Sequence, residues 1–481
     1  MLWMFGAALA ADCGDDLERA QARLRARKPL AATLGAFELL ESGACPEHDG
    51  AARLLMGRGL LALDLPHSAQ HYFLEVVTDP PSERAAEIAV VRLVQIAELT
   101  GDDDLLMRLV PAMDERDWPE PARDHLHYAA GSRAWQQGEL SEARRHFSQV
   151  SPESALGSRA LYSEGVALVE QGRLKSAAKE FVRVGRLGYH DDWAALGMGR
   201  VYYGIGRYDL AGHWFEQVPV TSDQFAEARF ENAWSSFMQN DPNRALGELL
   251  TLKAPGYADT VYQPEAALLE SIVWYSLCEW EASRASLDVL DAAVRPVHEA
   301  LDAAIRPYAS DEGRRIAGEA YREWFVDDHD TALDRAVFLR LLQDRSLFSS
   351  VEHIDRVEGE RERISQQKSL WRDSVGVRLL ERLDRDQRRL ERKAGLHLLR
   401  RMAELDGTLR DLMGQADMVR YELLRAEREG LEDLAGGGEV FEARVDPDYA
   451  VDATRVMWPF NGEFWEDELG GYVYAEHGSC R

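Results

Sequence analysis

The chain has 481 residues, of which 46% are hydrophobic, so it is too apolar for wholesale disorder and longer than one hydrophobic core usually serves. Its 84 acidic and 56 basic side chains give a net charge of −28, which would repel nucleic acid and anionic lipid surfaces. Nucleic acid is therefore not expected as a partner. Beyond the first ten residues no uncharged apolar run of about 18 residues predicts a membrane span.

The first ten residues are apolar and end in a small-x-small run at 8–10, which is typical of a signal peptidase site. We therefore interpret residues 1–10 as a signal peptide and expect export. No Lys or Arg precedes the apolar run, so a cytoplasmic chain with an apolar start is the alternative. Cys13 follows closely, but Asp12 stands where a lipoprotein box needs a small residue, which makes lipidation the lesser interpretation.

Four cysteines, an even number in an exported chain, favour disulfide formation. Cys13 and Cys45 bracket two amphipathic stretches, and in an antiparallel helical hairpin the start of the first helix lies beside the end of the second. We expect a disulfide between them. A second disulfide, between Cys278 and Cys480, would staple the tail to the last repeat. The alternative is four free thiols, with Cys278 as a small buried hydrophobic residue.

A spacing of 34 residues is the strongest signal in the chain. Six columns share it: Gly131, Gly165, Gly199 and Ala233; Gly138, Gly172, Gly206 and Asn240; Leu140, Leu174, Tyr208 and Pro242; Ala143, Ala177, Ala211 and Ala245; Phe147, Phe181, Phe215 and Leu249; Val150, Val184, Val218 and Leu252. Small residues let two helices cross closely, and Gly permits a left-handed turn. The Ala and Phe columns share one helix face. The spacing therefore predicts helical hairpins.

Residues 206–215, Gly-Arg-Tyr-Asp-Leu-Ala-Gly-His-Trp-Phe, resemble the tetratricopeptide repeat (TPR). That family has a small residue in the first helix, a Gly at the turn, an aromatic residue two later, an Ala, and an aromatic residue four beyond. Weaker copies extend the array on both sides. The resemblance implies an all-α fold, with a right-handed α-solenoid of about eight hairpins over residues 11–292.

In the TPR family, particular first-helix positions face the concave groove. By register, these positions carry seven aromatic residues and one arginine: Tyr128, Trp135, Tyr162, Arg200, Tyr203, Phe230, Trp234 and Phe237. Aromatic and arginine side chains anchor protein ligands, so we predict that this set binds a partner. The alternative is that the aromatic stripe packs against the neighbouring repeat.

Between Pro307 and Pro447 the sequence lacks proline and is rich in Arg, Glu, Asp and Leu, as long helices are. Within it, apolar residues recur in steps of three and four: Leu398, Met402, Leu405, Leu409, Leu412, Ala416, Val419, Leu423 and Ala426. This is the spacing of a coiled-coil seam. We expect residues 293–435 to form a coiled-coil-like antiparallel hairpin, which either projects from the solenoid or pairs with another subunit as a dimer.

Residues 436–481 are expected to form a short irregular tail. From residue 431 onwards the sequence contains twelve acidic and three basic side chains. At 458–465 lies the aromatic stretch Trp-Pro-Phe-Asn-Gly-Glu-Phe-Trp, which would be a sticky patch in water. We expect it to dock onto the solenoid, with a linear motif for another protein as the alternative.

The sequence contains no recognisable enzyme signature, so we predict a non-enzyme with no cofactor, catalytic residue or metal site. His67 and His71 share a helix face at a spacing that metals can use, but no third ligand is apparent. The acidic run at 327–330 is interpreted as a helix start. A hydrolase that uses carboxylates of the long helices is the remote alternative.

The repeats, the charged helices and the Trp-Pro-Phe-x-Gly-Glu-Phe-Trp ending also resemble exported TPR proteins of gliding and predatory Gram-negative bacteria, some linked to gliding-motility complexes. This resemblance implies a periplasmic scaffold of an envelope complex. Its partners would be envelope or outer-membrane proteins, bound in the groove and through the long helices. The alternative is a periplasmic assembly factor or chaperone that uses the groove on transient clients.

Overall fold

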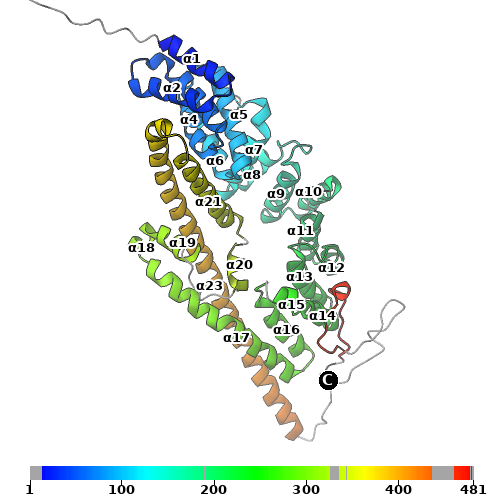
Figure 1. Ribbon diagram of the computed structural model, residues 1–481. Coiled ribbons are helices and arrows are strands. Elements are labelled where there is room, and N and C mark those ends of the chain that lie inside the picture. Colours follow the sequence, from blue (N-terminus) through cyan, green and yellow to red (C-terminus); the bar gives the residue numbers. More distant parts are fainter. Residues whose placement is uncertain are drawn as a thin grey trace, which may run out of the picture. The chain divides into compact units, whose positions relative to one another are not determined.

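The computed structural model describes residues 13–115, 118–188, 191–258, 261–325, 335–342, 344–435, 460–476 and 478. Helices make up nearly all of this part of the chain (Figure 1), which confirms the all-α prediction. Among the described helices, none combines the length and the apolarity that crossing a membrane requires. The expected signal peptide lies outside the described residues.

Contacts divide the chain into two compact units. The first unit comprises Met1–Leu156 and Ser346–Gly395, and the second comprises Gly157–Arg345 and Leu396–Arg481. The division expected from the sequence follows the type of helix along the chain, whereas these two units follow packing. The long-helix region therefore contributes to both.

Within the described residues, the first unit begins with four helical hairpins. They are α1 (Cys13–Arg25) with α2 (Pro29–Ser42), α3 (Asp49–Leu61) with α4 (Pro66–Thr78), α5 (Glu83–Thr100) with α6 (Asp103–Leu109), and α7 (Arg123–Gln136) with α8 (Leu140–Phe147). Short 3₁₀ turns at Pro46–His48, Val110–Ala112 and Glu120–Ala122 connect them. Pro29 and Pro66 open their helices, at positions where a missing backbone N–H costs no intrahelical hydrogen bond.

A second layer of the first unit comes from late in the sequence. It consists of α21 (Arg345–Ser365), α22 (Ser369–Trp371), a π-helical turn (Arg372–Gly376) and the first part of α23 (Val377–Ala435). Gln387 donates a hydrogen bond to Glu358, and Arg361 forms an ion pair with Asp384. The later residue of α21 thus contacts the earlier residue of α23, so these two helices are antiparallel. We call residues 346–395 the returning hairpin.

The returning hairpin packs on the repeats of its own chain. Its buried apolar side chains belong to the same core as the four hairpins: Val357, Ile364, Trp371, Val375, Leu379 and Leu383. The indole Nε1 of Trp371 also donates to Thr33 Oγ1 at 2.8 Å. The expectation that the long helices project or pair with another subunit is therefore wrong for this segment, because its apolar face is covered within the chain.

The second unit contains a further four hairpins among the described residues. They are α9 (Gly157–Glu170) with α10 (Leu174–Leu187), α11 (Asp191–Gly204) with α12 (Tyr208–Phe215), α13 (Phe225–Met238) with α14 (Pro242–Thr251), and α16 (Glu265–Ser276) with α17 (Trp280–Ile305). Shorter helices follow or intervene: α15 (Pro255–Ala258), a 3₁₀ turn (Arg306–Tyr308), α18 (Asp311–Arg315), α19 (Ala317–Phe325) and α20 (Arg335–Leu342).

The coiled-coil seam of α23 is buried inside the second unit. Figure 1 shows α17 and the end of α23 side by side, and His298 Nδ1 lies 2.6 Å from Asp406 Oδ1 while Arg420 lies 2.8 Å from Asp291. Of the seam residues, Leu398, Met402 and Leu409 are fully buried. A dimer through this seam would first have to separate α23 from helices of its own chain.

The 34-residue columns explain how each hairpin closes. A Cβ built on Gly131 would come within 2.7 Å of the Phe147 ring, and one on Gly165 within 2.6 Å of the Phe181 ring. A larger side chain at these positions would force the two helices apart. The turn column has positive φ throughout: Gly138 76°, Gly172 71°, Gly206 76° and Asn240 62°. The repeat is therefore a packing constraint as well as a sequence pattern.

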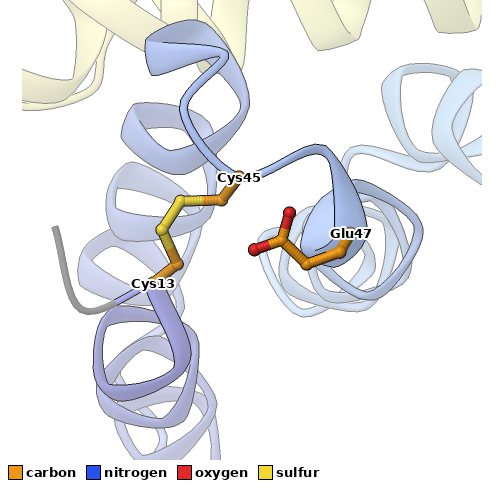
Figure 2. Close-up of side chains that lie close together, drawn as sticks. All are labelled: Cys13, Cys45 and Glu47. Atoms are coloured by element: carbon orange, nitrogen blue, oxygen red, sulfur yellow. A yellow bond between two sulfur atoms is a disulfide. The ribbon is translucent and has the colours of Figure 1, made fainter. Parts of the chain in front are cut away.

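A disulfide closes the first hairpin. Figure 2 shows Cys13 at the start of α1 joined to Cys45, which follows α2, and their Cα atoms are 6.1 Å apart. The Glu47 carboxylate points toward this bond, but disulfide sulfurs offer a metal no thiolate, so this group is not a metal site. Of the second expected pair, Cys278 lies in the turn between α16 and α17, whereas Cys480 lies outside the described residues.

The C-terminal segment docks on the second unit. Glu476 N donates to Asn243 Oδ1 at 2.8 Å, and Asn243 Nδ2 donates to the Glu476 carbonyl oxygen at 3.0 Å. Gly470 N donates to Thr251 Oγ1 at 3.0 Å. Asn243 and Thr251 lie eight residues apart, on one face of α14. The tail therefore binds this face largely through its backbone.

The described part of the aromatic stretch, residues 460–465, does not dock as expected, and residues 458 and 459 lie outside the described residues. Phe460 and Trp465 remain 48% and 59% exposed, and Phe460 packs instead on Phe464 at a ring distance of 5.1 Å. Tyr474 docks, since its ring contacts Trp274 of α16 at 5.6 Å. Docking is thus decided by the backbone hydrogen bonds of residues 470–476 and not by the density of aromatic residues.

Candidate protein-binding surface

Three of the eight predicted binding residues line one pocket in the second unit. Arg200 and Tyr203 come from α11 and Trp234 from α13, and Gly204 and Glu231 complete a pocket of about 310 Å³. The two helices are the first helices of successive hairpins. Register on the repeat therefore places these side chains together, while their role in partner binding stays a prediction.

The helical repeat directs these residues toward the pocket. Gly199 is buried against the second helix of its hairpin, and each residue turns the helix by about 100°. Arg200 therefore points to a different side, where Tyr203 and Gly204 follow it at the i+3 and i+4 positions. The sequence pattern did not identify Glu231, because a charge pair between successive first helices has no signature in either helix.

An ion-pair network crosses the pocket. Arg200 Nε donates to Glu231 Oε1 at 2.8 Å, and its terminal nitrogen donates to Glu227 Oε1 at 3.0 Å. Burial raises the pKa of Glu231 more than the neighbouring guanidinium lowers it. Two carboxylates surround one arginine, so the rim of the pocket is acidic around an aromatic wall.

Three predicted residues outside this pocket contact the phenylalanine of their own hairpin. Tyr128 and Trp135 lie in the first unit and contact the Phe147 ring at 5.6 and 6.1 Å. Tyr162 contacts the Phe181 ring at 5.5 Å. In each case the partner is the Phe column of the same repeat. Packing against the neighbouring repeat, the alternative expected from the sequence, is therefore seen for Tyr162, whereas the ring contacts of Tyr128 and Trp135 lie within their own hairpin.

Phe230 and Phe237 lie at the edge of a core formed by α13, α14 and α16. Both are half-buried, and the Phe237 ring contacts Trp234 at 6.2 Å. Neither residue lines the pocket. The aromatic stripe thus divides into residues that build the hairpins and a smaller group that stays accessible.

A second cavity, of about 430 Å³, lies in the first unit between the repeats and the returning hairpin. Its lining combines apolar surface with charged and polar side chains, which include His67, Asp102, Arg133, His353 and Lys393. Of these, sequence reasoning singled out only His67. The others were missed because they come from helices far apart in the sequence, and nothing in their local patterns indicates that they meet.

A buried carboxylate beside this cavity caps α4. Glu360 of α21 is fully buried, and it accepts hydrogen bonds from Ser68 N at 3.0 Å and from Ser68 Oγ and His67 Nδ1 at 2.9 Å each. Its Oε1 also accepts from His67 N. The residue before α4 is Leu65, which has no side-chain acceptor. Glu360 therefore satisfies the free N–H groups of this helix start and complements its dipole.

The histidines that share a face of α4 do not form a metal pair. His67 contacts Glu360, whereas His71 Nε2 lies 2.5 Å from Asp386. The ring of His353 lies 4.5 Å from that of His67, and burial lowers the pKa of His353 to about 4, so it is uncharged at neutral pH. Among the described residues, no cluster of three potential metal ligands includes His67 or His71.

No protein-family model matches the chain, and no curated protein matches it. Solved structures with some similarity include a tetratricopeptide repeat protein from Parabacteroides merdae, with 12% identity, a TM-score of 0.28, and coverage of 58% of this chain and 93% of that one. The Cut9–Hcn1 heterotetramer of the APC/C has 12% identity, a TM-score of 0.32, and coverage of 78% and 66%. PilW, a type IV pilus biogenesis factor, has 13% identity, a TM-score of 0.21, and coverage of 59% and 93%.

These similarities are too distant to support an argument about function. The description of this chain as an array of TPR-like hairpins rests on its own 34-residue register and on the glycine–phenylalanine contacts that the register produces.

Proposed function

We propose that this chain is a non-enzymatic scaffold that binds a protein partner at the pocket formed by α11 and α13. The supporting observation is the convergence of Arg200, Tyr203 and Trp234 from successive repeats. A pocket of about 310 Å³ is large enough for an anchoring side chain, and aromatic and arginine residues dominate the binding energy of protein interfaces.

The chemistry of the pocket indicates the kind of partner. Its aromatic wall favours an apolar anchor, and the two carboxylates that pair with Arg200, Glu231 in the pocket and Glu227 beside it, favour a neighbouring Lys or Arg. The net charge of −28 would speed the approach of such a segment. The proposed ligand is therefore a peptide or helix that carries an apolar side chain beside a basic one.

The proposed location is the bacterial envelope, after export. A Cys13–Cys45 disulfide suits an oxidising compartment, and the sequence resembles exported TPR proteins of gliding and predatory bacteria. We favour a fixed part in an envelope complex, including one of motility, over an assembly factor or chaperone with many clients. The dimer through the long helices is not part of this proposal, because its seam is buried within the chain.

The pocket is tested by crosslinking in native cells, followed by affinity measurement with the captured partner. Trp234→Ala and Arg200→Glu are expected to weaken binding at least tenfold, since both remove an anchor of the pocket. Met238→Ser is the matched control, because Met238 lies on the same helix, outside the pocket, and is 46% exposed. Unchanged affinity in both pocket variants, with folding intact, would refute the site.

The location is tested by alkylating the thiols of protein from fractionated cells under denaturing conditions. Cys13 and Cys45 are expected to resist alkylation until a reductant is added. Free thiols at both positions, in protein found in the cytoplasm, would contradict export.

The crosslinking experiment distinguishes the two kinds of scaffold. One partner recovered in constant proportion would favour a fixed complex, whereas many weakly held partners would favour the chaperone alternative.

A further inference from the structure

Three residues of metal-binding types converge beside the fourth hairpin of the first unit. Glu115 comes from the connection before α7, His127 from α7 and His146 from α8, and one ligand atom of each lies within 4.8 Å of the others. Both histidines are buried, at 5% and 7% exposure. No local motif marks this cluster, because its members come from three separate segments.

The distance between the two imidazoles fits a shared metal ion. His127 Nδ1 lies 3.2 Å from His146 Nδ1. Two Zn–N bonds of about 2.0–2.1 Å at a tetrahedral angle place their nitrogens about 3.3 Å apart. Without an ion, the two atoms can stay this close only if one ring donates a hydrogen bond and the other accepts it.

The surroundings suit a metal ligand. Glu142 Oε1 lies 3.3 Å from His146 Nε2, and a carboxylate that accepts the Nε2 proton leaves Nδ1 free to bind a cation. Trp118 is buried and contacts both rings, edge-on to His127 at a ring distance of 5.0 Å and stacked on His146 at 6.1 Å. The indole is part of the buried surroundings of the two imidazoles.

Arg145 is the competitor for this position. It donates to Glu115 Oε2 at 3.1 Å and to Glu142 Oε1 at 2.7 Å, and its terminal nitrogen lies 2.8 Å from His146 Nε2. A guanidinium only donates, so this contact requires Nε2 to accept and leaves the proton on Nδ1. A metal ion would have to displace Arg145, whose side chain is 44% exposed and has solvent to move into.

We propose that Glu115, His127 and His146 bind a transition metal ion of the Zn²⁺ class. Two imidazoles and a carboxylate form a ligand set that Zn²⁺ commonly uses, with the fourth position left to water. The ion would tie the connection before α7 to both helices of the hairpin, as a structural clamp. This site is independent of the proposed partner pocket, which lies in the other unit.

Zn²⁺ and Co²⁺ titrations of the full chain, after removal of metals with EDTA, test the proposal. One ion per chain is expected by calorimetry, with Co²⁺ giving the absorption bands of a tetrahedral site. His127→Gln and His146→Gln should each weaken binding more than tenfold. His125→Gln is the control, because His125 lies on the same helix and contacts Glu98 instead.

Two further variants keep the test decisive if a buried histidine variant fails to fold. Glu142→Gln should weaken binding about 10- to 100-fold, as is usual when a carboxylate that orients a ligand is lost. Arg145→Gln should tighten binding, because it removes the competitor. Zn²⁺ should also raise the melting temperature of the native chain and of His125→Gln.

The proposal is overturned if the native chain shows no saturable binding of either ion. It is equally overturned if folded His127→Gln and His146→Gln bind as the native chain does, or if His125→Gln loses binding to the same degree. If the chain binds neither metal ion, a hydrogen bond between the two neutral imidazoles would explain the short distance between His127 Nδ1 and His146 Nδ1.

Discussion

The two units are built from the same hairpin, yet they are covered in different ways. In the first, the returning hairpin adds apolar side chains and the buried carboxylate of Glu360 to the repeats. In the second, the later part of α23 packs beside α17 and a short tail binds one face of α14, while the pocket of α11 and α13 is separate from that tail. A stack of hairpins leaves polar and apolar surface at its faces, so the segment laid over it decides which surface becomes core.

The largest effect is expected from removing the cap on α4. Glu360→Ala would leave the backbone N–H groups of His67 and Ser68 without their buried acceptor, at a cost of about 3–5 kcal/mol. Urea unfolding of the chain would show a lower first-unit transition. Glu358→Ala is the control, because Glu358 is exposed, and it should change stability by less than about 0.5 kcal/mol. Equal effects of the two changes would contradict the capping role.

The glycine column gives the next effect, and one that the hairpins of both units share. Gly165→Ala should destabilise the second unit by about 1–3 kcal/mol, because its Cβ would lie too close to Phe181. Gly407→Ala should instead stabilise the protein by up to about 1 kcal/mol, since nothing lies within 4 Å of its Cβ and alanine is the better helix former. Thermal unfolding distinguishes the two signs, and stabilisation by both changes would refute the close-packing account.

Release of the tail should be a local effect. A Cβ on Gly247 would overlap the Tyr472 carbonyl oxygen, so Gly247→Ala should detach residues 470–476 while the hairpins stay folded. Amide exchange at Gly470 and Glu476 should quicken about tenfold or more. Gly185→Ala, whose Cβ would lie 4.0 Å from the nearest neighbour, serves as the control. Unchanged exchange at both amides would mean that docking does not depend on this contact.

The smallest effect is expected for the pocket itself. Arg200→Ala should change the free energy of unfolding by less than about 1 kcal/mol, because its side chain is 42% exposed and exposed ion pairs contribute little. Partner binding should nevertheless fall. A large loss of stability would mean that Arg200 belongs to the core of the second unit. The pocket would then resemble the surface of the first unit that the returning hairpin covers.

The repeats could be predicted because one constraint recurs. In three of the four aligned repeats a glycine faces a phenylalanine where the two helices cross, and this pair recurs at fixed spacing, as in Gly131 with Phe147. The seam of α23 was also readable from its apolar spacing. The helix that covers the seam could not be predicted. Apolar residues in steps of three and four indicate that one face of a helix is buried, but they do not indicate which helix packs on it.

The candidate sites could be predicted from the sequence only in part. Register brought Arg200, Tyr203 and Trp234 together, since it is a property of the repeat. Glu360 and the cluster of Glu115, His127 and His146 depend on contacts between distant segments, which leave no local pattern. The tail shows an error of the other kind. The density of aromatic residues predicted that Phe460 and Trp465 dock, but their rings are exposed. The residues that dock are those whose backbone forms hydrogen bonds with α14.

The cap on α4 has a consequence for the order of folding. Its acceptor lies 293 residues further along the chain than the helix it caps, so the N-terminal repeats cannot reach their final stability until residue 360 has emerged and returned. Contacts of such long range slow folding. A chain shortened after the repeats would keep α4 uncapped and the core of the first unit open to water, so the first 156 residues are not an autonomous domain.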